Sequence, residues 1–157
     1  MNKVFLGLGA NVGDRKSNIN LAIKLLQEKV KDIKVAPMYE SRPVGHKNQA
    51  NFLNTALMGT TDLSPLELLN FVKQIEKNVG RIKRFRWGPR EIDIDILFYE
   101  SSIYHDDSIQ IPHPRLHERD FVLKPLLELE PEFIHPVFKE SLSVLYSKLE
   151  TKELSII

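Results

Sequence analysis

Cysteine is absent from this sequence, and neither sign of charge is in excess. Without cysteine the chain forms no disulfide and no thiolate metal site. Its 22 basic and 21 acidic residues leave a net charge of +1, which argues against a general nucleic-acid partner but permits a local basic patch. No apolar run approaches the ~20 residues that span a bilayer, and the N-terminal apolar stretch lacks a signal-peptide cleavage pattern. We therefore expect a cytoplasmic protein with no membrane partner.

The common nucleotide-binding motifs are absent as well. No Walker A sequence occurs, so any ATP site does not use a P-loop. Gly7, Gly9 and Gly13 have the spacing G-x-G-x-x-x-G, one residue longer than the dinucleotide fingerprint. We interpret these glycines as a tight turn between a strand and a helix. Since 157 residues are too few for two cores, we expect residues 1–157 to form a single domain.

Apolar periodicity predicts the main elements. Short apolar or alternating runs predict strands at residues 3–9, 33–41, 51–61 and 92–99. Pro37 interrupts the second run, which suggests an edge strand. Helical spacing predicts a first helix after a cap at Asp14, with a stripe of Ile19, Ala22, Ile23, Leu26 and Val30. A second helix begins with a capping box, ends at Gly80, and has a stripe of Leu68, Leu69, Val72, Ile75 and Val79.

The order of these elements is βαββαβ. It predicts an α+β protein with a ferredoxin-like core, in which helices pack on one face of a mostly antiparallel sheet. Residues 121–131 and 140–150 predict two additional C-terminal helices. No long apolar stripe is left unassigned, so we expect a monomer.

Two aspartates alternate with isoleucines in the last predicted strand. Residues two apart in a strand point to the same side, about 6 to 7 Å from each other. Asp93 and Asp95 therefore face one way, with Ile92, Ile94 and Ile96 facing the core. A divalent cation relieves the repulsion of two such carboxylates, and two Mg²⁺ ions can be bridged by them. The alternative is an ordinary solvated strand face.

A cationic segment precedes this strand. Five basic residues lie between Gly80 and Glu91, namely Arg81, Lys83, Arg84, Arg86 and Arg90. Cations beside metal-binding carboxylates suit a polyphosphate, because the metal and the arginines share its oxygens. Trp87, the only tryptophan, precedes a Gly88-Pro89 turn and could stack on a planar heterocycle. The alternative is a solvated basic loop with Trp87 in the core.

A histidine and two arginines follow in the segment IPHPRLHERDF. His113 lies between two prolines that fix its backbone, which makes it suitable for touching a phosphate. Arg115 and Arg119 are four apart on an expected helical turn and would form either a second phosphate clamp or a surface pair. We expect ordinary surface or core roles for the remaining histidines, which are His46, His105, His117 and His135.

The segment RWGPR followed by DIDI resembles the signature of the 6-hydroxymethyl-7,8-dihydropterin pyrophosphokinases of folate biosynthesis. The segments GLGANVGD, YESRPVG with QANFLNTAL, and IPHPRLHERDFVLKPLLEL are similar to three further blocks of that family, in the same order. The resemblance implies transfer of diphosphate from the co-substrate ATP to the pterin's hydroxymethyl oxygen, with release of AMP. It also implies two Mg²⁺ ions as cofactors.

The resemblance also implies roles for individual residues. Asp93 and Asp95 would hold both metals and, with Arg81 and Arg90, form the catalytic set. The ATP site would comprise Leu69, Lys83, Arg84, Arg86, Arg90, Ile96, His113 and Arg119. The pterin site would comprise Ser41, Pro43, Val44, Gly45, Phe52, Asn54, Trp87, Asp93 and Phe121, and the loop with Trp87 would close over both substrates. Three residues depart from the best-known bacterial pattern, namely Arg42, Ser108 and Gln110. Arg42 lies on the pterin side, whereas Ser108 and Gln110 stand at positions where contacts with ATP are expected.

Two other functions fit parts of the pattern. Ferredoxin-like sheets with aromatics and arginines bind RNA, but the RNP1 pattern is missing and the aspartate pair would repel phosphates without metal. A nucleotidyl transferase could use the same two-metal chemistry and would release pyrophosphate rather than AMP. We therefore expect small-molecule substrates and no nucleic-acid partner.

Overall fold

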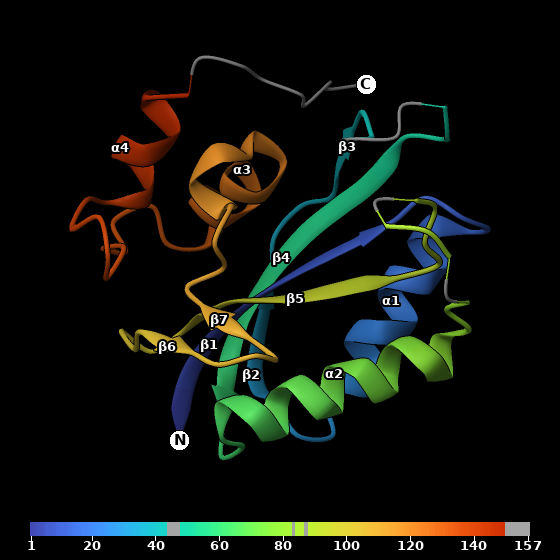
Figure 1. Cartoon of the computed structure of the whole chain (residues 1–157), viewed down its shortest axis with the longest axis horizontal. Helices are drawn as coiled ribbons and strands as arrows, with labels where there is room; N and C mark the ends of the chain where they lie inside the picture. The colour runs from blue at the N-terminus through green and yellow to red at the C-terminus, as the bar shows by residue number, and fades with distance from the viewer. Residues whose placement is uncertain (44–47, 83, 87, 150–157) are drawn as a thin grey trace.

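An antiparallel sheet with helices on both faces forms the body of the molecule (Figure 1). The computed structural model describes residues 1–43, 48–82, 84–86 and 88–149. The predictions for Val44, Gly45, Lys83 and Trp87 lie outside these residues. Within them, no helix has both the length and the apolar character needed to cross a bilayer.

In the part of the chain that the structure describes, seven strands and four α-helices follow one another. Their bounds are β1 Asn2–Ala10, α1 Arg15–Leu26, β2 Lys31–Val35, β3 Tyr39–Ser41, β4 Phe52–Thr61, α2 Pro65–Val79, β5 Asp93–Tyr99, β6 Tyr104–His105, β7 Gln110–Ile111, α3 Asp120–Leu129 and α4 Leu142–Ser147, with a 3₁₀ turn η1 at Leu116–Glu118. The small β6–β7 hairpin has no counterpart in the sequence-based prediction, because its strands are too short to show an apolar period.

The main sheet has the order β2-β4-β1-β5, and β3 also pairs with β4. Every pairing within it is antiparallel. This arrangement confirms the ferredoxin-like core. The strand expected at 33–41 is divided in two, since the backbone leaves the sheet around Pro37 before β3 resumes pairing with β4. Proline lacks the N–H that a continuous ladder needs.

The ends of the two core helices follow the sequence signals. Asp14 caps α1 by accepting the backbone N–H of Ser17 at 3.1 Å. Ser64 and Glu67 form the expected capping box of α2, with bonds of 3.2 and 2.9 Å. Gly80 ends that helix at φ 109°, a left-handed conformation that favours glycine.

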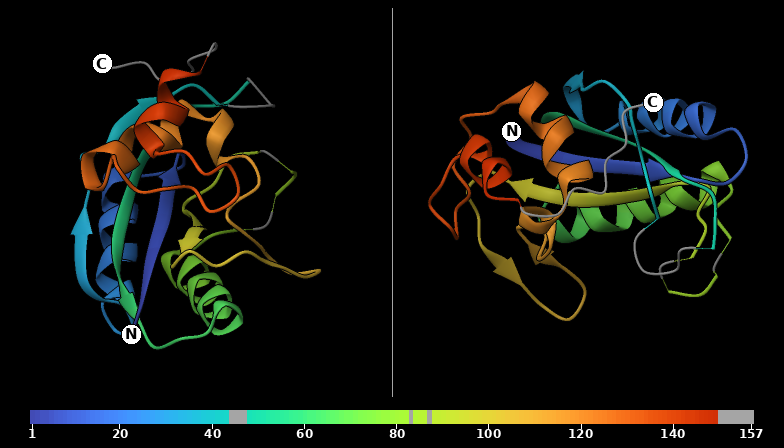
Figure 2. Two further views of the ribbon diagram at one scale, coloured as in Figure 1. Left: turned by 90° about the vertical axis from the view of Figure 1, so that its left-hand side faces the viewer. Right: turned by 90° about the horizontal axis from the view of Figure 1, so that it is seen from above.

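The two faces of the sheet carry separate apolar cores. Helices α1 and α2 cover one face, where the buried residues include Ile19, Val72 and Ile94. Helices α3 and α4 cover part of the other face, where Phe5 and Phe98 pack with leucines of both helices. In the left view of Figure 2, α3 and α4 lie in front of the sheet and α1 behind it. The expectation of helices on one face therefore holds for the core helices and not for the C-terminal pair.

A bulge in β5 matters for the position of the aspartates. Leu6 of β1 pairs with Ile96, but the preceding Phe5 pairs with Phe98, so Leu97 is the extra residue. Leu97 and Phe98 consequently both join the core under α3. Before the bulge the strand alternates, with Ile94 and Ile96 on the α1–α2 side. Asp93 and Asp95 thus lie on the α3 side, where a cavity opens beside the helix.

Candidate active site

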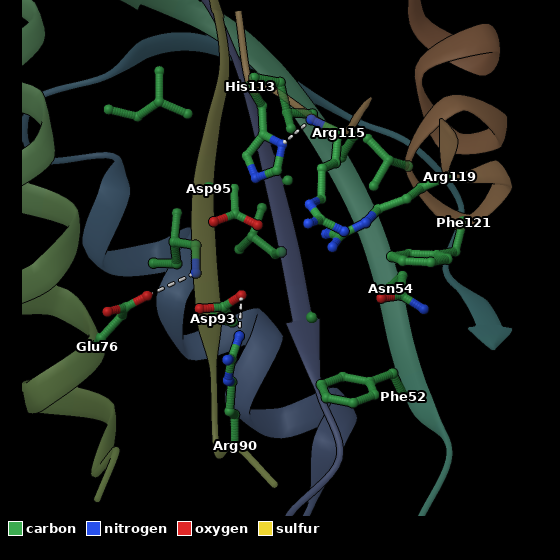
Figure 3. A pocket seen from close by; sticks show the side chains of 18 of the residues that line it. Phe52, Asn54, Glu76, Arg90, Asp93, Asp95, His113, Arg115, Arg119 and Phe121 are labelled. Carbon is green, nitrogen blue, oxygen red and sulfur yellow. Dashed lines mark hydrogen bonds and ion pairs between the residues drawn. The ribbon is translucent and has the colours of Figure 1, made fainter. Parts of the chain in front are cut away.

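A cavity of about 550 Å³ lies over β1 and between β5, β4 and α3. Its acidic wall is the start of β5, and its aromatic wall is formed by the start of β4 and by α3 (Figure 3). Gly9 is paired with Asp93 on one side and with Asn54 on the other, and Gly7 is paired with Asp95 and Ala56. The two walls are therefore one strand apart.

The floor between the walls is bare backbone. A Cβ at Gly9 would stand 3.0 Å from Oδ1 of Asn54, and one at Gly7 would stand 3.3 Å from Cδ1 of Leu97. The interpretation of both glycines as a turn was wrong, because they lie inside β1; only Gly13, at φ 70°, belongs to the turn. Glycine at these two positions allows a ligand to approach the main chain of β1 closely, which any side chain would obstruct.

The two aspartates have different surroundings. Asp93 accepts a hydrogen bond from Nη1 of Arg90 at 2.9 Å and lies 3.6 Å from Nη1 of Arg81. Among the described residues, no ion pair within 4 Å is seen for Asp95. Burial, reinforced by the charge of Asp93, raises the pKa of Asp95 from its ordinary value to about 8, although Arg119 opposes the shift. The two aspartates of the acidic wall therefore differ in their contacts with arginine.

A third carboxylate that lines the cavity, Glu76 of α2, was not expected from the sequence. It is 6% exposed, accepts the backbone N–H of Ile94 at 2.8 Å, and pairs with Nη1 of Arg81 at 2.7 Å. Burial raises its pKa, against the effect of these two partners. A signal existed, since Glu76 continues the buried α2 positions Leu68 and Val72 at intervals of four.

The cationic residues divide into two groups. Three members of the cationic segment line the cavity, together with two arginines from the η1 region and one lysine of α2: Arg81, Arg86, Arg90, Arg115, Arg119 and Lys73. Arg84 does not line it. Its guanidinium donates to both carboxylate oxygens of Glu91 at 2.8 and 2.7 Å. Arg84 is therefore directed to Glu91 in this structure, and its expected place on the ATP side stays a prediction.

His113 lies at the upper edge of the acidic wall (Figure 3). Its backbone N–H donates to the carbonyl oxygen of Leu97, and its Nδ1 accepts the N–H of Arg115 at 3.2 Å. Burial, with a further effect of Arg119, lowers the pKa of His113 to about 4. The ring is neutral near pH 7 and can donate a hydrogen bond from Nε2.

The opposite wall combines two phenyl rings with an amide. Phe52, Asn54 and Phe121 come together there, with Asn54 between the rings in the view of Figure 3. Nδ2 of Asn54 donates to Oγ of Ser41 at 2.6 Å, and Asn54 is only 7% exposed. The Arg119 guanidinium lies 5.7 Å from the Phe121 ring. Pro43 is buried but does not line the cavity, contrary to expectation.

Further residues that were predicted to contact a substrate also line the cavity. The cavity is also lined by Leu69 and Ile96, and by all three residues that depart from the common bacterial pattern, Arg42, Ser108 and Gln110. The structure thus gathers residues from both predicted substrate sites around one cavity.

The donor set fits divalent metal. Within the described ranges, no group of three or more histidine, aspartate or glutamate side chains is placed to hold an ion. Asp93 and Asp95 supply hard carboxylate oxygens on the face of β5 that borders the cavity. A cation that takes its other ligands from phosphate and water suits such a pair.

Comparison with known proteins identifies the family. The model of the 7,8-dihydro-6-hydroxymethylpterin-pyrophosphokinase family matches residues 5–131. A protein of Aquifex aeolicus named 2-amino-4-hydroxy-6-hydroxymethyldihydropteridine pyrophosphokinase is 51% identical over 142 residues, which cover 90% of this chain and 89% of that protein. A Bacillus subtilis protein of the same name is 43% identical over 130 residues, covering 82% of this chain and 78% of its own.

Longer relatives contain the same region. The folic acid synthesis protein FOL1 of Dictyostelium discoideum is 47% identical over 135 residues, which cover 86% of this chain but only 20% of that protein. The solved structure of wild-type Plasmodium falciparum HPPK-DHPS with pteroate superposes with a TM-score of 0.73 at 19% identity, covering 94% of this chain and 42% of the other. That likeness shows the fold. The match over residues 5–131 and the two relatives of similar length show that this chain belongs to the 7,8-dihydro-6-hydroxymethylpterin-pyrophosphokinase family.

Proposed function

We propose that this chain transfers the diphosphate of ATP to the hydroxymethyl group of 6-hydroxymethyl-7,8-dihydropterin and releases AMP, in folate biosynthesis. The observation that carries the proposal is the cavity's two unlike walls. Carboxylates and arginines suit a polyphosphate, while Phe52, Asn54 and Phe121 suit a flat, hydrogen-bonding heterocycle, and one strand separates them.

The aromatic wall is assigned to the pterin. Phe52 and Phe121 provide ring faces for stacking. The carboxamide of Asn54 presents an acceptor and a donor to a pterin edge. Its bond to Ser41 fixes its orientation before the ligand arrives, which reduces the entropy lost on binding. The bare backbone at Gly9 lets the ring lie directly over β1.

The acidic wall is assigned to the reacting phosphates. Two Mg²⁺ ions held by Asp93 and Asp95 would neutralise phosphate charge and make the pterin hydroxyl easier to deprotonate. Arg81 and Arg90, already beside Asp93, would bind the oxygens of the transferred group, and Arg119 with neutral His113 would bind the remaining phosphate. Leu69 and Ile96 would contact the adenine.

Bond making and breaking follow from this arrangement. The hydroxymethyl oxygen attacks the β-phosphorus of ATP, the bond between the α-phosphate and the β-phosphorus breaks, and the electron pair leaves with AMP. The hydroxyl proton passes to solvent. The chain's own residues contribute mainly by holding the oxygen and the phosphorus in line and by offsetting charge that develops on the phosphate oxygens.

The remaining expectations belong to the same proposal. The substrates are small molecules, and we infer a cytoplasmic monomer that consists of one domain. No nucleic acid is required, because the arginines that would bind a nucleic-acid backbone line the same cavity as Asp93 and Asp95, whose carboxylates would repel its phosphates.

Product analysis tests the proposal. The protein is incubated with ATP, Mg²⁺ and 6-hydroxymethyl-7,8-dihydropterin, and the nucleotides are separated by chromatography. AMP should accumulate in step with the pterin diphosphate. ADP would indicate transfer of a single phosphoryl group, and free pyrophosphate would indicate a nucleotidyl transferase; either result would refute the proposal. Asp95→Asn, which keeps the side chain's size, serves as the inactive control.

A further inference from the structure

Asn11 occupies a position that connects the two walls of the cavity. It follows the last residue of β1, which is paired with β4 on one side and β5 on the other. Because both pairings are antiparallel, the end of β1 lies at the start of β4 and at the start of β5. The segment leading into the aromatic wall and the segment leading into the acidic wall therefore both pass Asn11, which is 6% exposed.

On the acidic side, Asn11 is bonded to Arg90 in both directions. The backbone N–H of Asn11 donates to the carbonyl oxygen of Arg90 at 3.0 Å, and the N–H of Arg90 donates to Oδ1 of Asn11 at 2.8 Å. The side chain of Arg90 in turn pairs with Asp93 at 2.9 Å. Asn11 thus fixes the backbone of Arg90, whose side chain is paired with Asp93.

On the aromatic side, the same carboxamide holds the segment before β4. Nδ2 of Asn11 donates to Oε1 of Gln49 at 2.8 Å and to the carbonyl oxygen of Ala50 at 2.9 Å. Phe52 and Asn54 follow within four residues of Ala50. The amide cannot be reversed, since that would set its NH₂ against the N–H of Arg90 and its oxygen against the carbonyl of Ala50. One side chain therefore uses its acceptor for one wall and both its donors for the other.

We propose that Asn11 is a positioning residue that couples nucleotide binding to pterin binding. When phosphates hold Arg90 in place, its bonds to Asn11 also restrict the Asn11 carboxamide, which in turn holds Ala50 and the segment before Phe52. The pterin then binds an aromatic wall whose backbone is already ordered. The coupling is reciprocal, as any linkage between two binding equilibria must be. The inference rests on the proposed function, because it assigns the two walls to the two substrates.

Calorimetry measures this coupling directly. The pterin dissociation constant is determined with and without saturating α,β-methylene-ATP and Mg²⁺, an analogue in which the bond to be cleaved is blocked. The ratio of the two constants is the coupling factor, for which we expect about tenfold in the parent protein. Asn11→Asp keeps the acceptor for Arg90 but replaces both donors with a carboxylate oxygen, which repels the carbonyl of Ala50 and can be bonded by Gln49 only if the Gln49 amide turns. It should lower the factor to within about twofold of unity, while nucleotide binding alone changes less than threefold.

Arg15 offers a matched control. Its Nη1 donates to the carbonyl oxygen of Asn51 at 3.1 Å and to Glu40 at 3.2 Å, so it holds the same segment without touching Arg90. Arg15→Gln should weaken pterin binding equally with and without nucleotide and leave the coupling factor unchanged. If Asn11→Asp does not fold, Gln49→Leu breaks one of the two links from a half-exposed partner, and should lower the factor at least threefold.

Each outcome decides the matter. A coupling factor in Asn11→Asp that equals the parent's would overturn the assignment. A coupling factor that falls as far in Arg15→Gln as in Asn11→Asp would also overturn it, because any loosening of the segment before Phe52 would then be enough to abolish the coupling. A parent protein that forms AMP but has a factor of one would also overturn it while the proposed function stands. A parent protein that binds both ligands but forms no AMP would overturn the proposed function alone.

Discussion

Glu76 accepts the backbone N–H of Ile94, the residue between the two aspartates, at 2.8 Å. β5 is the outermost strand of the main sheet, so this N–H points away from β1 and would lack a strand partner. A buried carboxylate of α2 takes that place and also holds Arg81 at 2.7 Å. The helix on one face thereby fixes both the strand that carries the two aspartates and the guanidinium of Arg81 beside Asp93.

Replacing that carboxylate should affect turnover more than binding. Glu76→Gln retains an acceptor for Ile94 but removes the charge that holds Arg81, which would be left with Asp93 at 3.6 Å. We expect kcat to fall by about one to two orders of magnitude, with a smaller change in the KM for ATP, because a misplaced catalytic arginine loses transition-state contacts worth a few kcal/mol. Steady-state kinetics would contradict this if kcat stayed within about twofold.

The Arg84–Glu91 pair should compete with the nucleotide. Glu91 also accepts the N–H of Ile82, and its bonds to Arg84 lower the pKa of Glu91 to about 2, so the pair is charged near pH 7. Glu91→Gln should release Arg84 and tighten binding of an ATP analogue about two- to fivefold. Arg84→Ala in the Glu91→Gln background should remove that gain, which a double-mutant cycle by calorimetry would detect. Equal affinities in all four proteins would mean that Arg84 never reaches the phosphates.

Asp95→Asn should inactivate the protein and stabilise its free form. Activity should fall by about three orders of magnitude or more, because metal stabilisation of charge is worth several kcal/mol. The ligand-free fold should gain about 1–3 kcal/mol near pH 7, because Asn is neutral without the proton that the Asp95 carboxyl has to take up on folding, its pKa being raised to about 8. Asp107→Asn, an exposed aspartate outside the cavity, is the control and should alter neither property. Turnover within threefold of the parent, or a lower unfolding midpoint without ligands, would contradict these expectations.

His135 should make the fold sensitive to mild acid. Its Nδ1 accepts the N–H groups of Val137 and Phe138 at 3.1 and 3.3 Å, and burial lowers its pKa to about 4. The neutral ring is favoured in the fold, while the unfolded histidine takes up a proton near pH 6.5. The contribution to stability is therefore complete above about pH 7 and is lost as the pH falls from 6.5 to 4, by roughly 2–3 kcal/mol in all.

Urea unfolding at a series of pH values would measure this loss. His135→Asn keeps an acceptor near the same N–H groups but does not titrate, so its stability should decline less across that window than the parent's. His105→Gln changes an exposed histidine and should follow the parent curve. An unchanged slope in His135→Asn would assign the acid sensitivity to other groups.

The sequence predicted those features that depend on local periodicity. The alternation Ile92 to Ile96 placed both aspartates on one side, and the capping box fixed the start of α2. It did not predict the face on which α3 and α4 pack, because their apolar stripes fit either side of the sheet. Nor did it predict the bulge at Leu97, since an extra strand residue depends on the pairing partner.

The site residues that were missed act through tertiary contacts. Gly7 and Gly9 have the same two-residue period as Asp93 and Asp95, which could have indicated one face of a strand, but their role depends on the β1 pairing register. Arg84 and Glu91 are seven residues apart in an irregular segment, so no period relates them.

A floor of main-chain atoms would also restrict resistance to inhibitors. A compound that lies over Gly9 contacts groups that every residue type possesses, so substitution cannot delete those contacts. Adding even a methyl group there would bring it to 3.0 Å from Oδ1 of Asn54 and fill the space that the substrate also needs. Escape from such a compound would have to arise in the walls, and inhibitors that draw most of their affinity from the floor should lose least when the walls change.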